Sequence, residues 1–369
     1  MERYIIGAGI EEIETPALLL DLDKLEYNIH KMADFFNGKG SSIRPHFKTH
    51  KSPFLAHKQI EAGAIGISCQ KLSEAEVLAR SGIKDILITN EIIGSQKIKR
   101  LVNLAAYTNV KVAVDDENNA ERISEAALEK SVIINTLIEL NIGMNRCGVE
   151  PGEAALNLVQ KIKNLKGLKF LGIMAYEGHT VLIESFKERE VEVMNSLKKV
   201  SETRKILEDV GIDCEIISCG GTGTYMITGA YPGVTEIEAG SYLTMDAKYN
   251  LIEGVKGEFK NALSLLTTVI SIPSAERVII DAGMKAISKE YGMSVIKGNS
   301  KGAELYKLSE EHGFIRFIKD EEGDFEVGQK IELIPSHGCT TINLHDVYYG
   351  VRAGIVECIL PIEARGKFY

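Results

Sequence analysis

Asp85-Ile-Leu-Ile-Thr-Asn90 is a short apolar segment, and Val110-Lys-Val-Ala-Val-Asp115 repeats its pattern after a stretch with helical spacing. Short apolar runs that alternate with amphipathic stretches are typical of parallel strands buried on both faces of a sheet. The alternation continues in both directions along the chain. The strands that it predicts cover residues 17–21, 43–48, 64–70, 85–90, 110–115, 132–141, 168–176 and 214–218.

Eight strand–helix units predict a (β/α)8 TIM-type barrel, although the residues alone leave a doubly wound open sheet possible. After about residue 250 the pattern changes to strands separated by turns, without a long amphipathic helix. We therefore predict a barrel over residues 14–248 and a mainly β domain over residues 249–369, joined by residues 1–13. The strands predicted for the second domain cover 262–272, 276–281, 313–319, 330–334 and 346–356, with a turn at Glu322-Gly323-Asp324.

The composition narrows the classes of partner and compartment. The 369 residues are 44% hydrophobic and 26% charged, which is ordinary for a globular protein. A net charge of -9 argues against a nucleic-acid or membrane-surface partner. No apolar run approaches the length of a membrane span, and the N-terminus lacks the apolar core of a signal peptide. Six cysteines without a CxxC pair suit a reducing compartment, so we predict a cytoplasmic protein.

A basic segment, Arg44-Pro-His-Phe-Lys-Thr-His-Lys51, follows the second predicted strand. Lys48 stands where this strand gives way to a loop, and in a barrel such loops form the ligand-binding rim. Neighbouring cations and partial burial lower the pKa of a lysine, which makes its amine a nucleophile at neutral pH. The residues alone also describe a solvated basic loop.

Three further groups of polar residues and glycines follow later strands. Arg146 lies among glycines after the sixth strand, and Tyr176-Glu-Gly-His179 follows the seventh. Ser218-Cys-Gly-Gly-Thr-Gly-Thr224 follows the eighth and leads into a short helical segment, where backbone N–H groups suit a phosphate. A plain glycine turn explains the same segment, and Arg146 is either a ligand contact or a solvated surface residue.

The second domain carries a possible metal pair in Ser336-His-Gly-Cys339. If this segment is extended, His337 and Cys339 point to the same face. Imidazole and thiolate together suit zinc, and two protein ligands leave coordination positions for water or substrate. A packed histidine beside an inert cysteine is the alternative.

Taken together, these segments resemble the D-threonine aldolase and D-serine dehydratase family, which are pyridoxal-phosphate enzymes with an alanine-racemase-like N-terminal barrel. The matching segments stand in the family's order and span almost the whole chain. They are Arg44–Lys51, Gly143–Val149, Tyr176–His179, Gly220–Thr222, Ala239–Tyr242, Asp281–Ser288, Ser336–Cys339 with Asn343, and Pro361–Gly366.

The resemblance implies a role for each of these residues. Lys48 would carry pyridoxal phosphate as a Schiff base, Arg146 would contact the phenolic oxygen of the cofactor, and Tyr176 would lie beside it. His337 and Cys339 would be the family's zinc pair, in a homodimer whose second domain closes the partner's active site. The residues expected at the phosphate are Gly220, Gly221, Thr222, Gly240 and Ser241.

The reaction must be chosen within the family that the chain resembles. Its aldolases place an aspartate beside the cysteine position, whereas its dehydratases use His-x-Cys, as this chain does. A thiolate favours zinc over the manganese or magnesium of the aldolases. This predicts dehydration of a D-serine-like or D-threonine-like substrate to a keto acid and ammonia, with Lys48 removing the Cα proton and zinc binding the β-hydroxyl.

Three other functions remain open. In an aldolase the metal would activate the β-hydroxyl for Cα–Cβ cleavage to glycine and an aldehyde, with His179 as the candidate base. An amino-acid racemase would need a second base opposite Lys48, and the β domain shows no matching tyrosine motif. A pyridoxal-phosphate-binding protein without turnover would need neither the second domain nor the metal pair.

Overall fold

The structure is a computed structural model that describes residues 5–274, 276–298, 302–317 and 325–369. The chain divides into two compact units. The barrel unit comprises residues 32–48, 53–240 and 367–369, and the β unit comprises residues 1–31, 49–52 and 241–366. We predicted the division at 248, with residues 14–31 in the barrel. The turn predicted at Glu322–Asp324 lies outside the described residues.

The barrel unit contains an eight-stranded parallel sheet with the strand order β2-β9-β8-β7-β6-β5-β4-β3. A parallel bridge between His46, which follows β2, and Ser68 in β3 joins the two ends of this order, so the sheet closes. The predicted (β/α)8 barrel is thereby confirmed. Its strands are β2 (Ser42–Ile43), β3 (Ile67–Cys69), β4 (Asp85–Glu91), β5 (Asn109–Val114), β6 (Ile134–Glu139), β7 (Leu168–Ala175), β8 (Ile216–Cys219) and β9 (Glu236–Ile237).

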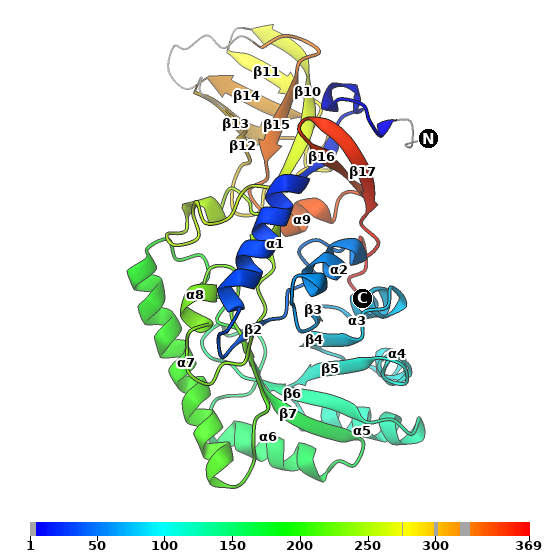
Figure 1. Cartoon of the computed structure of the whole chain (residues 1–369), viewed down its shortest axis with the longest axis vertical. Helices are drawn as coiled ribbons and strands as arrows, with labels where there is room; N and C mark the ends of the chain where they lie inside the picture. Colours follow the sequence, from blue (N-terminus) through cyan, green and yellow to red (C-terminus); the bar gives the residue numbers. More distant parts are fainter. Residues whose placement is uncertain (1–4, 275, 299–301, 318–324) are drawn as a thin grey trace. The chain divides into compact units, whose positions relative to one another are not determined.

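Helices alternate with these strands and lie outside the curved sheet, as α4, α5 and α6 show in Figure 1. Asp116 caps the N-terminus of α5, where its carboxylate accepts the Asn119 backbone N–H at 2.7 Å. Side chains from β4 to β7 pack in one cluster: Leu87, Ala113, Leu137, Leu171 and Met174. The helices of this unit are α2 (Pro53–Glu61), α3 (Leu72–Arg80), α4 (Ser95–Ala105), α5 (Glu117–Glu129), α6 (Glu153–Asn164), α7 (Phe186–Asp209) and α8 (Tyr225–Thr228).

The first predicted barrel strand belongs to the other sheet, which corrects the sequence-based assignment. β1 (Ala17–Asp21) pairs antiparallel with β10 and parallel with β16 in the β unit. The eighth barrel strand is β9, whose pairing continues where the His46 N–H donates to the Ala239 carbonyl at 3.1 Å. An apolar run indicates burial on both faces but does not indicate which sheet, and two residues are too few to show a period.

The β unit is built on a nine-stranded sheet with the order β13-β14-β11-β10-β1-β16-β17, in which β15 pairs with β10 and β12. The predicted mainly β domain is confirmed. The strand predicted at 346–356 is instead a hairpin, because Ala353 and Gly354 turn the chain with φ of 50° and 80°. The further strands are β10 (Leu263–Ser274), β11 (Arg277–Ile280), β12 (Val295–Ile296), β13 (Ala303–Leu308), β14 (Gly313–Phe317), β15 (Lys330–Ile334), β16 (Val347–Arg352) and β17 (Ile355–Pro361).

Few helices accompany the β unit. Helix α1 (Leu22–Phe36) contributes residues to both units, and α9 (Gly338–Ile342) lies within the β unit. Among the described residues, no helix is both long enough and apolar enough to span a bilayer. All six cysteines are free thiols.

Candidate active site

Lys48 lies in a turn after β2, on the rim formed by the C-terminal ends of the barrel strands. Its backbone N–H donates to His46 Nδ1 at 3.3 Å, and His46 Nε2 lies 3.1 Å from Thr89 Oγ1. The Lys48 ammonium stands 5.8 Å from the centroid of the Tyr176 ring, which directly follows β7. The structure therefore brings together two site residues that the sequence predicted from different strands.

Arg146 approaches the same aromatic ring from the end of β6. Its guanidinium carbon lies 5.9 Å from the Tyr176 centroid, and its Nη2 lies 3.5 Å from Glu139 Oε1. Cations placed over aromatic rings are attracted by the ring quadrupole. Lys48 and Arg146 thus form a cationic region around Tyr176 that suits an anionic ligand.

The glycine-rich turn after β8 packs against Tyr176. A Cβ at Gly221 would stand 3.3 Å from Tyr176 Cε2, so a side chain there would fill the space beside the ring. Two backbone N–H groups of the turn are used within the protein. Gly220 donates to Glu177 Oε2 at 3.0 Å, and Gly221 donates to Thr224 Oγ1 at 3.1 Å. These two bonds shape the turn, and the predicted phosphate contact remains a prediction.

Glu177 is a residue that the sequence analysis missed. It is fully buried next to Tyr176, and besides the Gly220 N–H its carboxylate accepts the hydroxyls of Thr224 at 2.8 Å and Thr228 at 2.5 Å. It therefore connects the end of β7 to the glycine-rich turn and α8. No local pattern predicts this, because a glutamate in a loop is usually solvated.

His179 lies at the exposed edge of the barrel rim. Its Nε2 is 3.4 Å from Ser196 Oγ on α7, and a Cβ at Gly143 would stand 2.9 Å from that nitrogen. The imidazole therefore packs on the start of the loop that carries Arg146. An exposed imidazole beside the cationic region has the chemistry of a general base.

Arg44 does not crowd Lys48, which corrects the predicted source of positive charge. It is buried and donates to Glu236 Oε1 at 2.9 Å and to Asp85, which is also 2.7 Å from Lys111 Nζ. Asp85 begins β4 and Glu236 begins β9, so this ion network lies at the N-terminal ends of the strands, opposite the rim.

Glu238 is a second missed residue with an electrostatic link to Lys48. Burial raises the pKa of its carboxyl to about 7, although a hydrogen bond from Ser218 Oγ at 2.7 Å and the charge of Lys48 both oppose the rise. The charge of this carboxyl therefore changes near neutral pH, and with it the field at Lys48.

In the β unit, His337 and Cys339 adjoin without being extended as predicted. His337 is the N-cap of α9, and Cys339 lies in the first turn of that helix. Cys339 Sγ is 3.5 Å from Oγ1 of Thr49, the residue after Lys48 in the chain. The extended assignment failed because Gly338 begins a helix, yet a spacing of two residues keeps the side chains close.

Asp246 orients His337 and was also missed. Its Oδ2 accepts from His337 Nδ1 at 2.9 Å and from the Gly338 backbone N–H at 3.1 Å. Burial lowers the pKa of His337, but Cys339 and Asp246 outweigh burial and raise this pKa. With Nδ1 directed to Asp246, Nε2 is the nitrogen left for a metal. Nε2 and the Cys339 thiol form a donor pair that fits zinc.

The barrel residues also fit pyridoxal phosphate. The Lys48 amine is a group that forms an imine with an aldehyde, and the cationic region suits a phosphorylated, anionic ring. Glycine at 221 leaves beside Tyr176 a space that a Cβ would fill. The donors and the space are therefore those that such a cofactor requires.

Known proteins match along the whole chain. The alanine racemase N-terminal domain matches residues 20–248, and a putative serine dehydratase domain matches residues 262–351. The chain is 38% identical to 3-hydroxy-D-aspartate aldolase from Paracoccus denitrificans and 36% identical to D-threonine aldolase from Arthrobacter sp., each over 98% of this chain and 95% of the relative. The crystal structure of D-threonine aldolase from Filomicrobium marinum superposes with a TM-score of 0.95 at 36% identity, covering 99% of each chain.

Dehydratases match at lower identity. D-threo-3-hydroxyaspartate dehydratase from Delftia sp. is 28% identical over 89% of this chain and 92% of its own length. D-serine dehydratase from Dictyostelium discoideum is 24% identical over 92% and 94%. Fold, site and relatives together define a lyase of D-β-hydroxy amino acids. The chain belongs to the D-threonine aldolase and D-serine dehydratase family, with its alanine-racemase-like barrel.

Proposed function

We propose that the protein is an aldolase that cleaves a D-β-hydroxy amino acid into glycine and an aldehyde. The observation that carries the proposal is the order of identities, 38% and 36% to two aldolases against 28% and 24% to two dehydratases. This reverses the preference for dehydration that the His-x-Cys spacing suggested.

Pyridoxal phosphate, when bound, supplies an electron sink for negative charge that develops at Cα of the substrate. In the proposal, Lys48 would hold the cofactor through Nζ. Arg146 would donate to the phenolic oxygen of the cofactor ring, and Tyr176 would lie beside that ring. Of the five residues predicted at the phosphate, Gly220 and Gly221 shape the turn through their bonds to Glu177 and Thr224, so we assign the phosphate to Thr222, Gly240 and Ser241.

His179 is the base for the β-hydroxyl in this proposal. Its Nδ1 removes the hydroxyl proton. Nε2 lies 3.4 Å from Ser196 Oγ, whose own hydroxyl donates to the Glu192 carbonyl, so Nε2–H donates to Ser196 and orients the ring. The electron pair left on oxygen forms the carbonyl of the aldehyde while the Cα–Cβ bond breaks. Lys48 then returns a proton to Cα, which completes glycine. His337 and Cys339 would hold the metal, whose chemistry is that of a Lewis acid for the hydroxyl.

Dehydration is the second candidate, because His337 and Cys339 present an imidazole and a thiol two positions apart. A solved cysteine-to-alanine mutant of D-threo-3-hydroxyaspartate dehydratase is in a metal-free form. In that case the hydroxyl would leave from Cβ, and the product would hydrolyse to a keto acid and ammonia. We propose zinc as the metal because Cys339 offers a thiolate, with manganese or magnesium as the alternative for an aldolase, and a homodimer as the assembly in either case. Metal analysis and sedimentation test these two points.

Product analysis decides between the candidates. D-threonine, D-serine and D-threo-3-hydroxyaspartate are each supplied alone, and the products are identified. Glycine with an aldehyde supports the aldolase, whereas a keto acid with ammonia shows dehydration.

A separate experiment tests the lysine. Lys48→Ala should lose the absorption band at about 420 nm and all turnover, while the exposed control Lys97→Ala keeps both. Borohydride reduction and peptide mapping should place the pyridoxyl group on Lys48. Finding it on Lys51 or Lys285 would overturn the assignment.

A further inference from the structure

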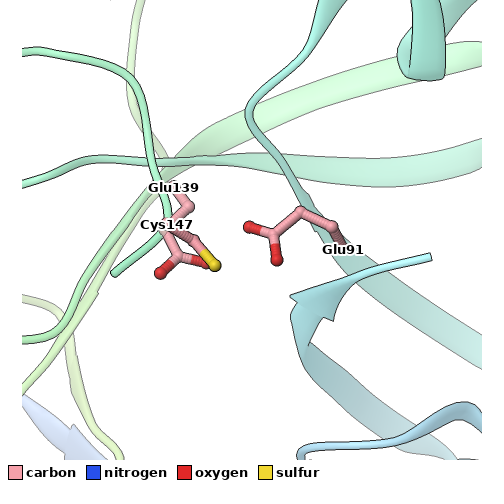
Figure 2. A group of neighbouring side chains, drawn as sticks. All are labelled: Glu91, Glu139 and Cys147. Carbon is pink, nitrogen blue, oxygen red and sulfur yellow. The ribbon is translucent and has the colours of Figure 1, made fainter. Parts of the chain in front are cut away.

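Three side chains that the proposed reaction does not use converge on the barrel rim. Glu91 is the last residue of β4, Glu139 is the last residue of β6, and Cys147 lies in the loop after β6. Their side chains point toward one another in Figure 2, and their ligand atoms all lie within 4.8 Å of one another. Two carboxyls and a thiol thus face a common point.

The backbone holds Cys147 in this place. The Val149 N–H donates to the Glu139 carbonyl and the Asn141 N–H donates to the Val149 carbonyl, both at 2.9 Å. Gly148 has a φ of +99°, and a Cβ there would stand 2.8 Å from the Asn141 nitrogen. The tight return of the loop therefore requires glycine at 148. The backbone alone therefore places Cys147 beside Glu139, without any contribution from side-chain contacts.

Glu139 supplies an independent sign that something positive belongs at this point. Its side chain is aimed at the cluster and the residue is only 4% exposed, yet within the described ranges no group donates to its Oε2. The same holds for Glu91 Oε1. Arg146 pairs with the other oxygen of Glu139, Oε1, at 3.5 Å. Burying a carboxylate oxygen without a partner is costly, so a proton or a cation must compensate it.

We propose that Glu91, Glu139 and Cys147 bind a divalent transition-metal ion of the zinc type. A thiolate disfavours magnesium and calcium, while two carboxylates with one thiolate suit zinc or cobalt. The donor atoms lie within 4.8 Å of one another, and small side-chain rotations toward their common point would bring them to roughly 2.0–2.3 Å from a bound ion. Three protein ligands leave a further position for water.

The ion would tie together three parts of the rim. Glu91 and Glu139 belong to strands separated by β5, and Cys147 is the residue after Arg146. Bound metal would therefore hold the Arg146 loop against the barrel. This site shares no residue with the His337 and Cys339 pair, and its existence does not depend on which reaction the protein catalyses.

Cobalt(II) is the probe, because a thiolate ligand gives it a charge-transfer absorption band. The experiment uses the full chain carrying His337→Ala and Cys339→Ser, which removes the other candidate pair. This chain should bind one Co²⁺ with the thiolate band, and Zn²⁺ should displace it. Adding Cys147→Ser should remove the band, and adding Glu139→Gln should weaken cobalt binding at least tenfold. The matched control Cys358→Ser should leave band and affinity unchanged.

Two results would overturn the proposal. If the chain with His337→Ala and Cys339→Ser has native circular dichroism and binds no cobalt at millimolar concentration, Glu91 and Glu139 share a proton instead. If binding persists with Glu139→Gln and Cys147→Ser together, the ion sits elsewhere. If the chain with His337→Ala and Cys339→Ser fails to fold, the stoichiometry of the native chain provides the test. The native chain should then bind two ions, and a chain with Cys147→Ser alone or Glu91→Gln alone should bind one. Equal stoichiometry in these three chains would also overturn the proposal.

Discussion

Glu139 and Glu177 are buried carboxyls at the ends of the neighbouring strands β6 and β7, and they differ in the hydrogen-bond donors that reach them. Glu177 is 0% exposed and accepts three hydrogen bonds, from Gly220, Thr224 and Thr228. Glu139 is 4% exposed, and no group in the described part of the chain donates to its Oε2. Burial, with Glu91 nearby, raises the pKa of Glu139 to about 9.

The difference shows that depth alone does not decide what a buried carboxyl does. Where donors converge, as at Glu177, the group organises the surrounding backbone. Where donors are missing, as at Glu139, the group is poised to take a proton or a cation. The first kind of site is scaffold for the glycine-rich turn, and the second is a place for chemistry or binding.

The largest expected effect is the loss of the Glu177 scaffold. Glu177→Ala leaves the Gly220 N–H and two threonine hydroxyls without their acceptor, which should lower the free energy of unfolding by roughly 3–5 kcal/mol. Urea denaturation measures the loss, and Glu177→Gln should cost clearly less because it keeps an acceptor oxygen. A Glu177→Ala protein as stable as the wild type would remove the contrast with Glu139.

Removing the cation beside Glu139 should affect binding rather than folding. Arg146→Ala should weaken cofactor retention by about 1.5–3 kcal/mol, because it removes a charged donor. Melting temperature should hardly change, since the Arg146 side chain is 39% exposed. Cofactor titration and thermal melts are the measurements, with Arg146→Lys as the charge-preserving control. A normal titration with a large fall in melting temperature would show that Arg146 is structural.

A third buried carboxyl, Asp246, extends the comparison to the β unit. Like Glu177 it is well supplied with donors, including the Tyr249 N–H at 2.9 Å and His337 Nδ1 at 2.9 Å. Asp246→Asn should lower metal affinity at His337 roughly 10–100-fold, because the amide oxygen that replaces the carboxylate carries no negative charge and orients the imidazole less firmly. Competition with a chromophoric chelator measures the affinity, and the exposed Asp346→Asn is the control. Equal affinities for the two variants would show that Asp246 does not position His337.

The smallest expected effect is the pH dependence of the free energy of unfolding, which reports on the protonation of Glu139. Its pKa rises from 4.5 to about 9, so between these values the folded chain holds a proton that the unfolded chain has lost. The stabilisation is therefore complete below pH 4.5 and lost as the pH rises through 9. The slope is at most about 1.4 kcal/mol per pH unit.

The measurement compares wild type and Glu139→Gln by urea denaturation, with a chelator, between about pH 7.5 and 8.5. In this range Glu238, with a pKa of about 7, is largely ionised and adds little. The wild type should lose stability with rising pH and the variant should lose less. Identical slopes would mean that Glu139 is ionised despite its burial.

How far the site could be predicted depends on whether the signal is local. Lys48, Arg146 and Tyr176 were predicted from the ends of three strands, because parallel strands in a barrel place their C-terminal ends on one rim. The partners of Arg44 were not predictable, because Asp85 and Glu236 are distant in sequence. Glu177, Glu238 and Asp246 were missed for the same reason: their roles depend on donors that reach them only in the folded chain.

The sequence by itself determined the barrel, the mainly β second domain and the family, because periodicity, strand order and motif order are properties of the chain. Only the tertiary structure decided that β1 belongs to the β unit and that His337 caps a helix. It also decided that Glu91, Glu139 and Cys147 meet. Sheet membership and burial arise from contacts between segments far apart in sequence, and no local pattern records which segments those are.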